Sequence, residues 1–301
     1  MKQSQRFILA LVGLGTIALS FSLKSSWAQS LSKVKVSYQT FERSHSTVHV
    51  VTIPHNGNYV VTPQIAGSLQ PLTELVDESA VAAINGGYFD PVNQKTTSFI
   101  VQNSLLVADP RFNERLVDNP DLKQYLRKIF NRAEFRAYNC QSGIEYDIQS
   151  HSSPIPPNCT LMSSLGGGPG LIPQDNSLVE GFTDYQDGKK VRDAIGSDRL
   201  NARSAVGITK NQDVMFVMVA QKSENPKNSG MSLAELGEVL TNLGAVKAMN
   251  LDGGSSSALY YQGETVYGRV DQDGKEIQRP IKSILSVIKP SITDQSLNNE
   301  E

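Results

Sequence analysis

The residues best suited to chemistry lie in one segment near the C-terminal end, Leu251-Asp252-Gly253-Gly254-Ser255-Ser256-Ser257. Asp252 follows the mainly apolar run 245–251, which is typical of a buried strand. The paired glycines remove side-chain bulk and let a ligand approach main-chain N–H groups closely. Hydroxyl side chains then follow. This pattern suits a polar or anionic small molecule better than it suits a core.

Four other segments place glycines or arginines beside an apolar strand. They are Asn85-Gly86-Gly87-Tyr88-Phe89, Gly166-Gly167-Gly168-Pro169, Arg203-Ser204 and Arg279-Pro280-Ile281. A single glycine pair usually marks only a turn. A turn, however, does not need an asparagine before the glycine pair and aromatic residues after it. Nor does it need an aspartate before the pair and hydroxyl side chains after it. The combination therefore favours a shared site.

The elements that must position these segments are mostly strand-like. Alternating runs at 34–41, 46–53 and 58–65, a short apolar run at 81–84, and a hairpin between 203–209 and 213–219 all predict strands. A second hairpin is expected over 97–107, around Asn103. The βα alternation of a doubly wound fold is missing from the first third. We expect an α+β (mixed α/β) fold: one domain over 34–290, with a largely antiparallel or mixed sheet and a few packed helices.

Helix signals occur at three places. A short helix is expected from Pro71 to Glu78, and Asn119-Pro120 predicts the start of a clear helix running past Ile129. The sequence 232–235 is a capping box, and Gly244 is the expected end of that helix. The polar stretch 173–201 is interpreted as a long loop.

The N-terminus predicts export. Lys2 and Arg6 precede an uncharged run over 7–23, and Ser26-Trp27-Ala28 offers small residues for cleavage. We therefore expect a signal peptide over 1–28, a linker over 29–33 and a disordered tail over 291–301. The alternative is an uncleaved N-terminal anchor. No further membrane span is expected, and the mature protein would be periplasmic or extracellular.

The charge balance excludes some partners. The whole chain has a formal net charge of −2, and loss of residues 1–28 would make it more acidic. No basic tail or cluster is present, which argues against nucleic acid or an anionic membrane surface as a partner.

The chain has two cysteines, Cys140 and Cys159. In an exported protein we expect them to form one disulfide, and free thiols are the alternative in a reducing compartment. The scattered histidines make a poor metal set. We therefore expect no metal site and no cofactor, although Ca²⁺ held by aspartate and carbonyl oxygens stays open.

Five motifs together resemble the phosphodiester glycosidase family. They are AAINGGYF, LGGGPGLI, RSAVGIT, NLDGGSSSALY and RPIKSILSV, and the resemblance covers roughly residues 75–290. Where the last motif commonly carries an asparagine, this chain has Ser283. The resemblance implies hydrolysis of the bond between the anomeric carbon of a sugar and a phosphodiester, with a carbohydrate phosphodiester as the substrate.

This chemistry assigns roles to the residues. Glycosyl transfer to water uses carboxylates to stabilise the transition state and activate water. Asp252 is the first candidate and Asp90 the second. Arg203 and Arg279 could bind phosphate oxygens in two-pronged fashion, and the glycine loops could add main-chain donors. These loops contain Gly86, Gly87, Gly167, Gly168, Gly253 and Gly254. Asn85, Ser255 and Ser256 are candidates for sugar hydroxyls, and Tyr88 and Phe89 for stacking on the sugar ring.

Structural roles compete with these assignments. Asp252 could hold its own turn, Asp90 could cap the turn at Pro91, and Arg203 could pair with a buried carboxylate. At the level of function, the alternatives are a non-catalytic module that binds glycans or anionic polymers in the cell envelope, and a phosphodiesterase that cleaves the P–O bond.

Overall fold

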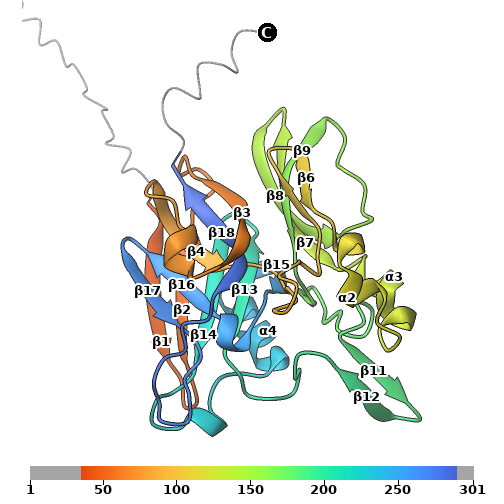
Figure 1. Cartoon of the computed structure of the whole chain (residues 1–301). Coiled ribbons are helices and arrows are strands. Elements are labelled where there is room, and N and C mark those ends of the chain that lie inside the picture. Colours follow the sequence, from red (N-terminus) through yellow and green to blue (C-terminus); the bar gives the residue numbers. More distant parts are fainter. Residues whose placement is uncertain (1–34, 290–301) are drawn as a thin grey trace, which may run out of the picture. The chain divides into compact units, whose positions relative to one another are not determined.

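Strands dominate residues 35–289, the part of the chain that the computed structural model describes (Figure 1). Strands account for 45% of the structure and helices for 13%. The expected α+β class is therefore wrong, and the fold is sheet-dominated. The expected signal peptide, linker and tail lie outside the described residues, and no helix within 35–289 is long and apolar enough to cross a membrane.

Within residues 35–289 the strands form four sheets. The first has the order β1 (Ser37–Glu42), β2 (Thr47–Ile53), β14 (Val214–Ala220), β13 (Arg203–Thr209), β15 (Ala245–Asn250) and β10 (Gly170–Ile172). The second has the order β17 (Glu264–Tyr267), β16 (Ala258–Tyr261), β4 (Ala80–Asn85), β18 (Ile281–Ile288) and β3 (Val60–Gln70). The third has the order β6 (Leu105–Ala108), β5 (Ile100–Gln102), β9 (Cys159–Gly166), β7 (Ala133–Cys140) and β8 (Gly143–Ser150), and the fourth is the hairpin of β11 (Thr183–Gln186) and β12 (Lys189–Asp193).

The helices within 35–289 are short. The α-helices are α1 (Leu72–Leu75), α2 (Glu114–Val117), α3 (Leu126–Ile129) and α4 (Leu233–Asn242), and the 3₁₀ turns are η1 (Pro110–Phe112), η2 (Lys123–Tyr125), η3 (Pro226–Asn228) and η4 (Gly254–Ser256). The capping box at α4 is confirmed, because the Ser232 side chain accepts from the Glu235 N–H and the Glu235 side chain accepts from the Ser232 N–H.

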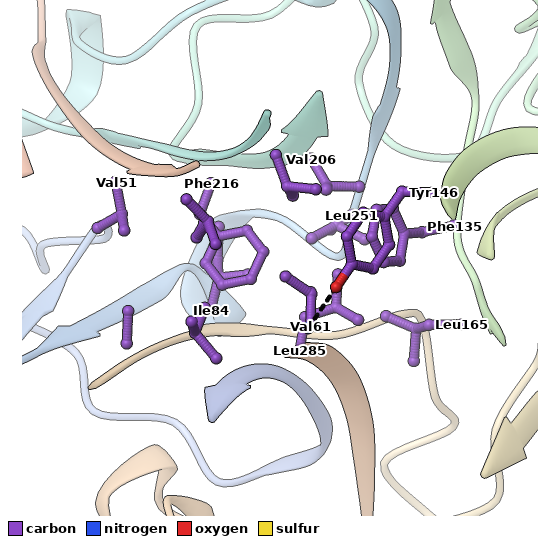
Figure 2. Packing of buried hydrophobic residues seen from close by; sticks show 14 of the residues in the cluster. Val51, Val61, Ile84, Phe135, Tyr146, Leu165, Val206, Phe216, Leu251 and Leu285 are labelled. Atoms are coloured by element: carbon purple, nitrogen blue, oxygen red, sulfur yellow. Dashed lines mark hydrogen bonds between the residues drawn. The ribbon is translucent and has the colours of Figure 1, made fainter. Parts of the chain in front are cut away.

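Strand β14 shows how the core is divided. All of its residues are buried. Because side chains alternate across a strand, they pack in two hydrophobic clusters, one on each face. Phe216 and Met218 join the large cluster shared by the first three sheets, where the Tyr146 hydroxyl oxygen also accepts a hydrogen bond from the Val61 N–H at 2.9 Å (Figure 2). Met215 and Val217 pack on the other face in the cluster that includes the buried side of α4. A strand covered on both faces explains the unbroken apolar run at 214–220.

Two local predictions are corrected. The clear helix expected from Asn119 onward is only the turn η2 followed by the single-turn α3. The apolar residues of this segment pack in a small separate cluster with Leu116, Tyr125 and Ile129, and so little buried surface does not support a longer helix. The stretch 173–201 contains the paired strands β11 and β12 rather than being all loop. The hairpins at 97–107 and 203–219 are confirmed.

Cys140 and Cys159 form a disulfide between directly opposed positions of β7 and β9. Their sequence separation is 19, and closing a loop of this size in the unfolded chain stabilises the fold by roughly 2–4 kcal/mol. We expect the Cys140→Ser/Cys159→Ser double variant to lose about this much free energy of unfolding in urea. Wild type in a thiol reductant is the matched control, and an unchanged unfolding midpoint in both would contradict the expectation.

Candidate active site

Asn85 ties the candidate site together from the end of β4. Its Oδ1 accepts from the Ser204 hydroxyl at 2.6 Å and from the Ala258 N–H at 3.1 Å, and its Nδ2 donates to the Asp252 carbonyl at 2.6 Å. The side chain is buried. Asn85 was expected to hold sugar hydroxyls, whereas in this arrangement it positions the backbone of Asp252.

The glycines after Asn85 are required by close packing. A Cβ at Gly86 would collide with the Ser283 hydroxyl, and one at Gly87 would collide with the carbonyl oxygen of Gly166. The Gly86 carbonyl accepts from the Asp252 N–H at 3.1 Å. The segment after β4 therefore brings the Gly166–Gly168 segment and the Asp252 turn side by side.

Most of the candidate phosphate donors in the glycine loops are already bonded. The N–H groups of Gly86, Gly167, Gly168 and Gly254 donate to the carbonyls of Ser283, Ala133, Asn250 and Ala202, respectively. The Gly253 N–H donates to the Asp252 carboxylate. In this structure, therefore, these glycines shape the site and orient the carboxylate more than they offer open donors.

Tyr88 and Asn250 form a second polar group next to the Asp252 turn. The Tyr88 hydroxyl donates to the Gly168 carbonyl at 2.8 Å and accepts from Asn250 Nδ2 at 2.7 Å. Burial, aided by the negative charge of Asp252, raises the pKa of Tyr88 well above its usual value, so the phenol is neutral. Asn250 was not among the sequence-predicted site residues; the available signal was an amide as the last residue of an apolar strand.

Asp252 is the carboxylate at the centre of these contacts. Burial raises its pKa to about 6, although a hydrogen bond from Ser256, the charge of Arg279 and the Gly253 N–H all favour the ionised form. A raised carboxyl pKa is typical of functional sites because it keeps the group close to its titration point near neutral pH.

Arg279 is the cation that the structure places beside Asp252. Its Nη1 lies 3.3 Å from both the Ser255 and the Ser256 hydroxyl oxygens. Its guanidinium carbon lies 4.9 Å from the centre of the Phe89 ring, a cation–π contact that holds the side chain over the ring. Predicted site residues from three distant segments of the sequence thus meet here.

Arg203 is placed differently. Its guanidinium is buried and donates to the carbonyls of Met231, Ile195, Gly196 and Arg199 at 2.9, 3.1, 2.5 and 2.9 Å, respectively. These bonds use most of its N–H donors. The sequence suggested either a phosphate ligand or the partner of a buried carboxylate; the structure instead makes Arg203 the anchor of the 195–199 loop.

Asp90 also has other partners. Its carboxylate accepts from Arg115 Nε at 2.7 Å and from the Val92 N–H at 2.8 Å. Partial burial opposes ionisation, but these two groups hold the pKa of Asp90 below its usual value. The capping role considered for Asp90 matches this geometry better than a catalytic one.

Three of the eight buried side-chain polar atoms without a hydrogen-bond partner in residues 35–289 lie on residues close to the Asp252 turn in the sequence or in space. Among residues 35–289, Asn250 Oδ1, Ser257 Oγ and Ser283 Oγ are buried and have no hydrogen-bond partner. Buried polar atoms without partners are unusual, and their position here is consistent with a binding site. No group of three or more His, Cys, Asp or Glu side chains in the described residues is placed to hold a metal ion.

Fold and site define a sheet-dominated domain in which segments that follow apolar strands bring one carboxylate and one arginine together. Residues 78–288 match the pattern of the phosphodiester glycosidase family. The chain belongs to this family, and the resemblance seen in its motifs is confirmed.

Solved structures share the fold, while no curated protein matches the sequence. A hypothetical protein from Synechocystis has a TM-score of 0.53 at 18% identity, with 84% of this chain and 62% of that chain covered. The catalytic domain of zebrafish N-acetylglucosamine-1-phosphodiester α-N-acetylglucosaminidase, auto-inhibited by its pro-peptide, has a TM-score of 0.58 at 15% identity. The match covers 85% of this chain and 83% of that chain. A Burkholderia pseudomallei protein described as exported has a TM-score of 0.55 at 15% identity, with 81% of this chain and 74% of that chain covered.

Proposed function

We propose that this protein is an exported hydrolase that cleaves the bond between the anomeric carbon of a sugar and a phosphodiester. The observation that carries the proposal is that the Ser256 hydroxyl lies between Asp252, whose pKa is about 6, and Arg279, and bonds to both. Membership of the phosphodiester glycosidase family and the fold shared with the zebrafish enzyme domain support it.

The leaving group explains why one carboxylate suffices. A phosphodiester departs as a stable anion, so it needs little help from a general acid. It needs a cation instead, and Arg279 can bind phosphate oxygens through paired N–H donors. Asp252 is then free to stabilise positive charge at the anomeric carbon or to activate the attacking water.

Export is supported by separate observations. Cys140 and Cys159 form a disulfide, which is typical of an oxidising compartment. The N-terminal sequence has the charge and small-residue pattern of a signal peptide. The Burkholderia pseudomallei neighbour is also described as exported. We assign the protein to the periplasm or the extracellular space.

Oxygen labelling tests the bond that is cleaved. A synthetic sugar 1-phosphodiester is hydrolysed in ¹⁸O-labelled water, and the products are weighed by mass spectrometry. We expect the label in the sugar, with unlabelled sugar incubated in the same water as the control for exchange. Label in the phosphate would assign the protein to P–O cleavage and overturn the proposal. Binding of the substrate without any product would leave a non-catalytic module.

The pH dependence gives a further prediction. The role proposed for Asp252 requires the ionised carboxylate, which is present above its pKa of about 6. We expect kcat/KM to fall about tenfold for each pH unit below this value, since only the ionised fraction reacts. Circular dichroism over the same range would control for unfolding. An acid limb near pH 4, as for an ordinary carboxyl group, would contradict the assignment.

A further inference from the structure

A polar cavity of about 710 Å³ lies between the third sheet and the edge of the first. The elements that line it include α3, β7, β8 and β15, which are labelled in Figure 1. Its volume is within the range of small-molecule sites, roughly 300–1,000 Å³. None of the catalytic candidates Asp252, Asp90 or Arg279 is among its lining residues.

The lining is cationic. Arg127, Lys128 and Lys247 contribute positive charges, and Glu180 is the one carboxylate among the lining residues. Both Glu180 carboxylate oxygens accept backbone N–H groups, from Gly170 at 2.9 Å and from Ala133 at 3.2 Å. This carboxylate is therefore turned toward the backbone, and the charge available to a ligand is positive.

The cations differ in how far they are engaged. Lys247 pairs with Asp147, and Lys128 donates to the Leu178 carbonyl at 3.1 Å. Arg127 is exposed, and its side chain has no hydrogen bond or ion pair to any other residue of 35–289. A guanidinium of this kind can form two parallel bonds to a phosphate or carboxylate without breaking an existing contact.

Uncharged polar groups complete the lining. Asn131, Gln149, Ser150 and Asn176 supply amides and a hydroxyl, and Ile148 and Ile172 supply apolar surface. Amide groups both donate and accept hydrogen bonds, so they match sugar hydroxyls. The cavity is also much larger than an inorganic anion requires.

The cavity and the candidate active site approach each other at Gly168. A Cβ on Gly168 would collide with the Glu180 carboxylate from the cavity side. On the other side, the Gly168 carbonyl accepts from Tyr88 and from Asn250 at 2.8 and 3.2 Å. Gly168 thus contacts residues of both sites, while Asp252 is not among the residues that line the cavity.

We propose that this cavity is a second binding site, selective for an anionic carbohydrate such as a sugar phosphate. Arg127 binds the anion, and the amide side chains bind hydroxyl groups. The site goes beyond the proposed hydrolysis, because it needs no contribution from Asp252 or Arg279.

Calorimetric titration tests the second site in an Asp252→Asn protein, so that no turnover disturbs the measurement. The probes are glucose 1-phosphate, inorganic phosphate and glucose. We expect glucose 1-phosphate to bind more tightly than either of the others. Arg127→Gln should weaken this binding about tenfold, since it removes a charged hydrogen bond. Lys247→Gln should weaken it less, because Asp147 already pairs with that ammonium group.

Lys123→Gln is the matched control, because Lys123 is an exposed residue of η2 outside the cavity lining and the substitution changes charge equally. Thermal unfolding checks that all variants fold. Equal affinity in Arg127→Gln and Lys123→Gln would overturn the site, and inorganic phosphate binding as tightly as glucose 1-phosphate would overturn its selectivity for a carbohydrate. Because this titration measures binding and not turnover, it still tests the second site if the labelling experiment shows no hydrolysis.

Discussion

Replacing Asp252 with asparagine is expected to lower kcat on a sugar 1-phosphodiester by a factor on the order of 10²–10⁴, the range for loss of a positioned acid–base group. Asparagine keeps the shape of the side chain and can still contact Ser256, but it cannot carry the negative charge or accept a proton from water. KM should change little, because Arg279 and the serine hydroxyls remain. Steady-state and single-turnover kinetics would separate the two parameters.

The same substitution should not unfold the protein. Burial raises the pKa of Asp252 from 3.8 to about 6. Stability associated with its protonated form is therefore fully present below about pH 4 and is lost as the pH rises through about 6. At neutral pH the ionised carboxylate costs stability relative to a neutral side chain. We expect the melting temperature of Asp252→Asn at pH 7.5 to equal or exceed that of wild type.

Asp90→Asn is the control for this experiment. It removes a carboxylate on the segment next to Phe89, and its ion pair with Arg115 is partly exposed, where such pairs are worth about 0–1 kcal/mol. We expect nearly wild-type kcat. Turnover retained in Asp252→Asn, or lost equally in Asp90→Asn, would remove Asp252 from its proposed role.

Local patterns in the sequence predicted the long elements well. The β13–β14 hairpin and α4 depend on periodicity, turn residues and a capping box within a few residues of each other, and such signals are visible in sequence. The balance between helix and strand was not visible in this way. The apolar spacing over 122–129 fits a helix, but only packing against the rest of the chain decides that one turn of α-helix forms there.

The candidate site shows the same limit. Asp252, Arg279 and the glycine segments were found because their residue types suit the chemistry, and the structure brings them together. The partners of Arg203 were not predictable, since all four are main-chain carbonyls: that of Met231, 28 residues away, and three in the 195–199 loop. Every residue has a main-chain carbonyl, so the residue types in a sequence do not show which carbonyls an arginine will bind.

Arg203→Leu is therefore expected to affect stability rather than substrate binding. Leucine fills part of the space but leaves the carbonyls around it without donors, and each buried carbonyl left unpaired costs roughly 1–3 kcal/mol. Because several of these contacts are only partly buried, we expect a total loss of roughly 3–5 kcal/mol in the free energy of unfolding, a size that indicates a broken buried network. Urea unfolding at pH 7.5 would measure it.

Arg279→Leu provides the opposite pattern. This side chain is partly exposed and contacts two serine hydroxyls and the Phe89 ring, so its removal should change stability by about 0.5 kcal/mol or less, as at most surface positions. Loss of a charged hydrogen bond to the leaving phosphate should lower kcat/KM roughly tenfold to a hundredfold.

Arg203→Lys should recover only part of the stability lost in Arg203→Leu, because an ammonium cannot reach carbonyls on several sides as a planar guanidinium does. If Arg203→Leu instead unfolded like wild type and bound substrate poorly, Arg203 would be the phosphate ligand and the division of roles between the two arginines would be reversed.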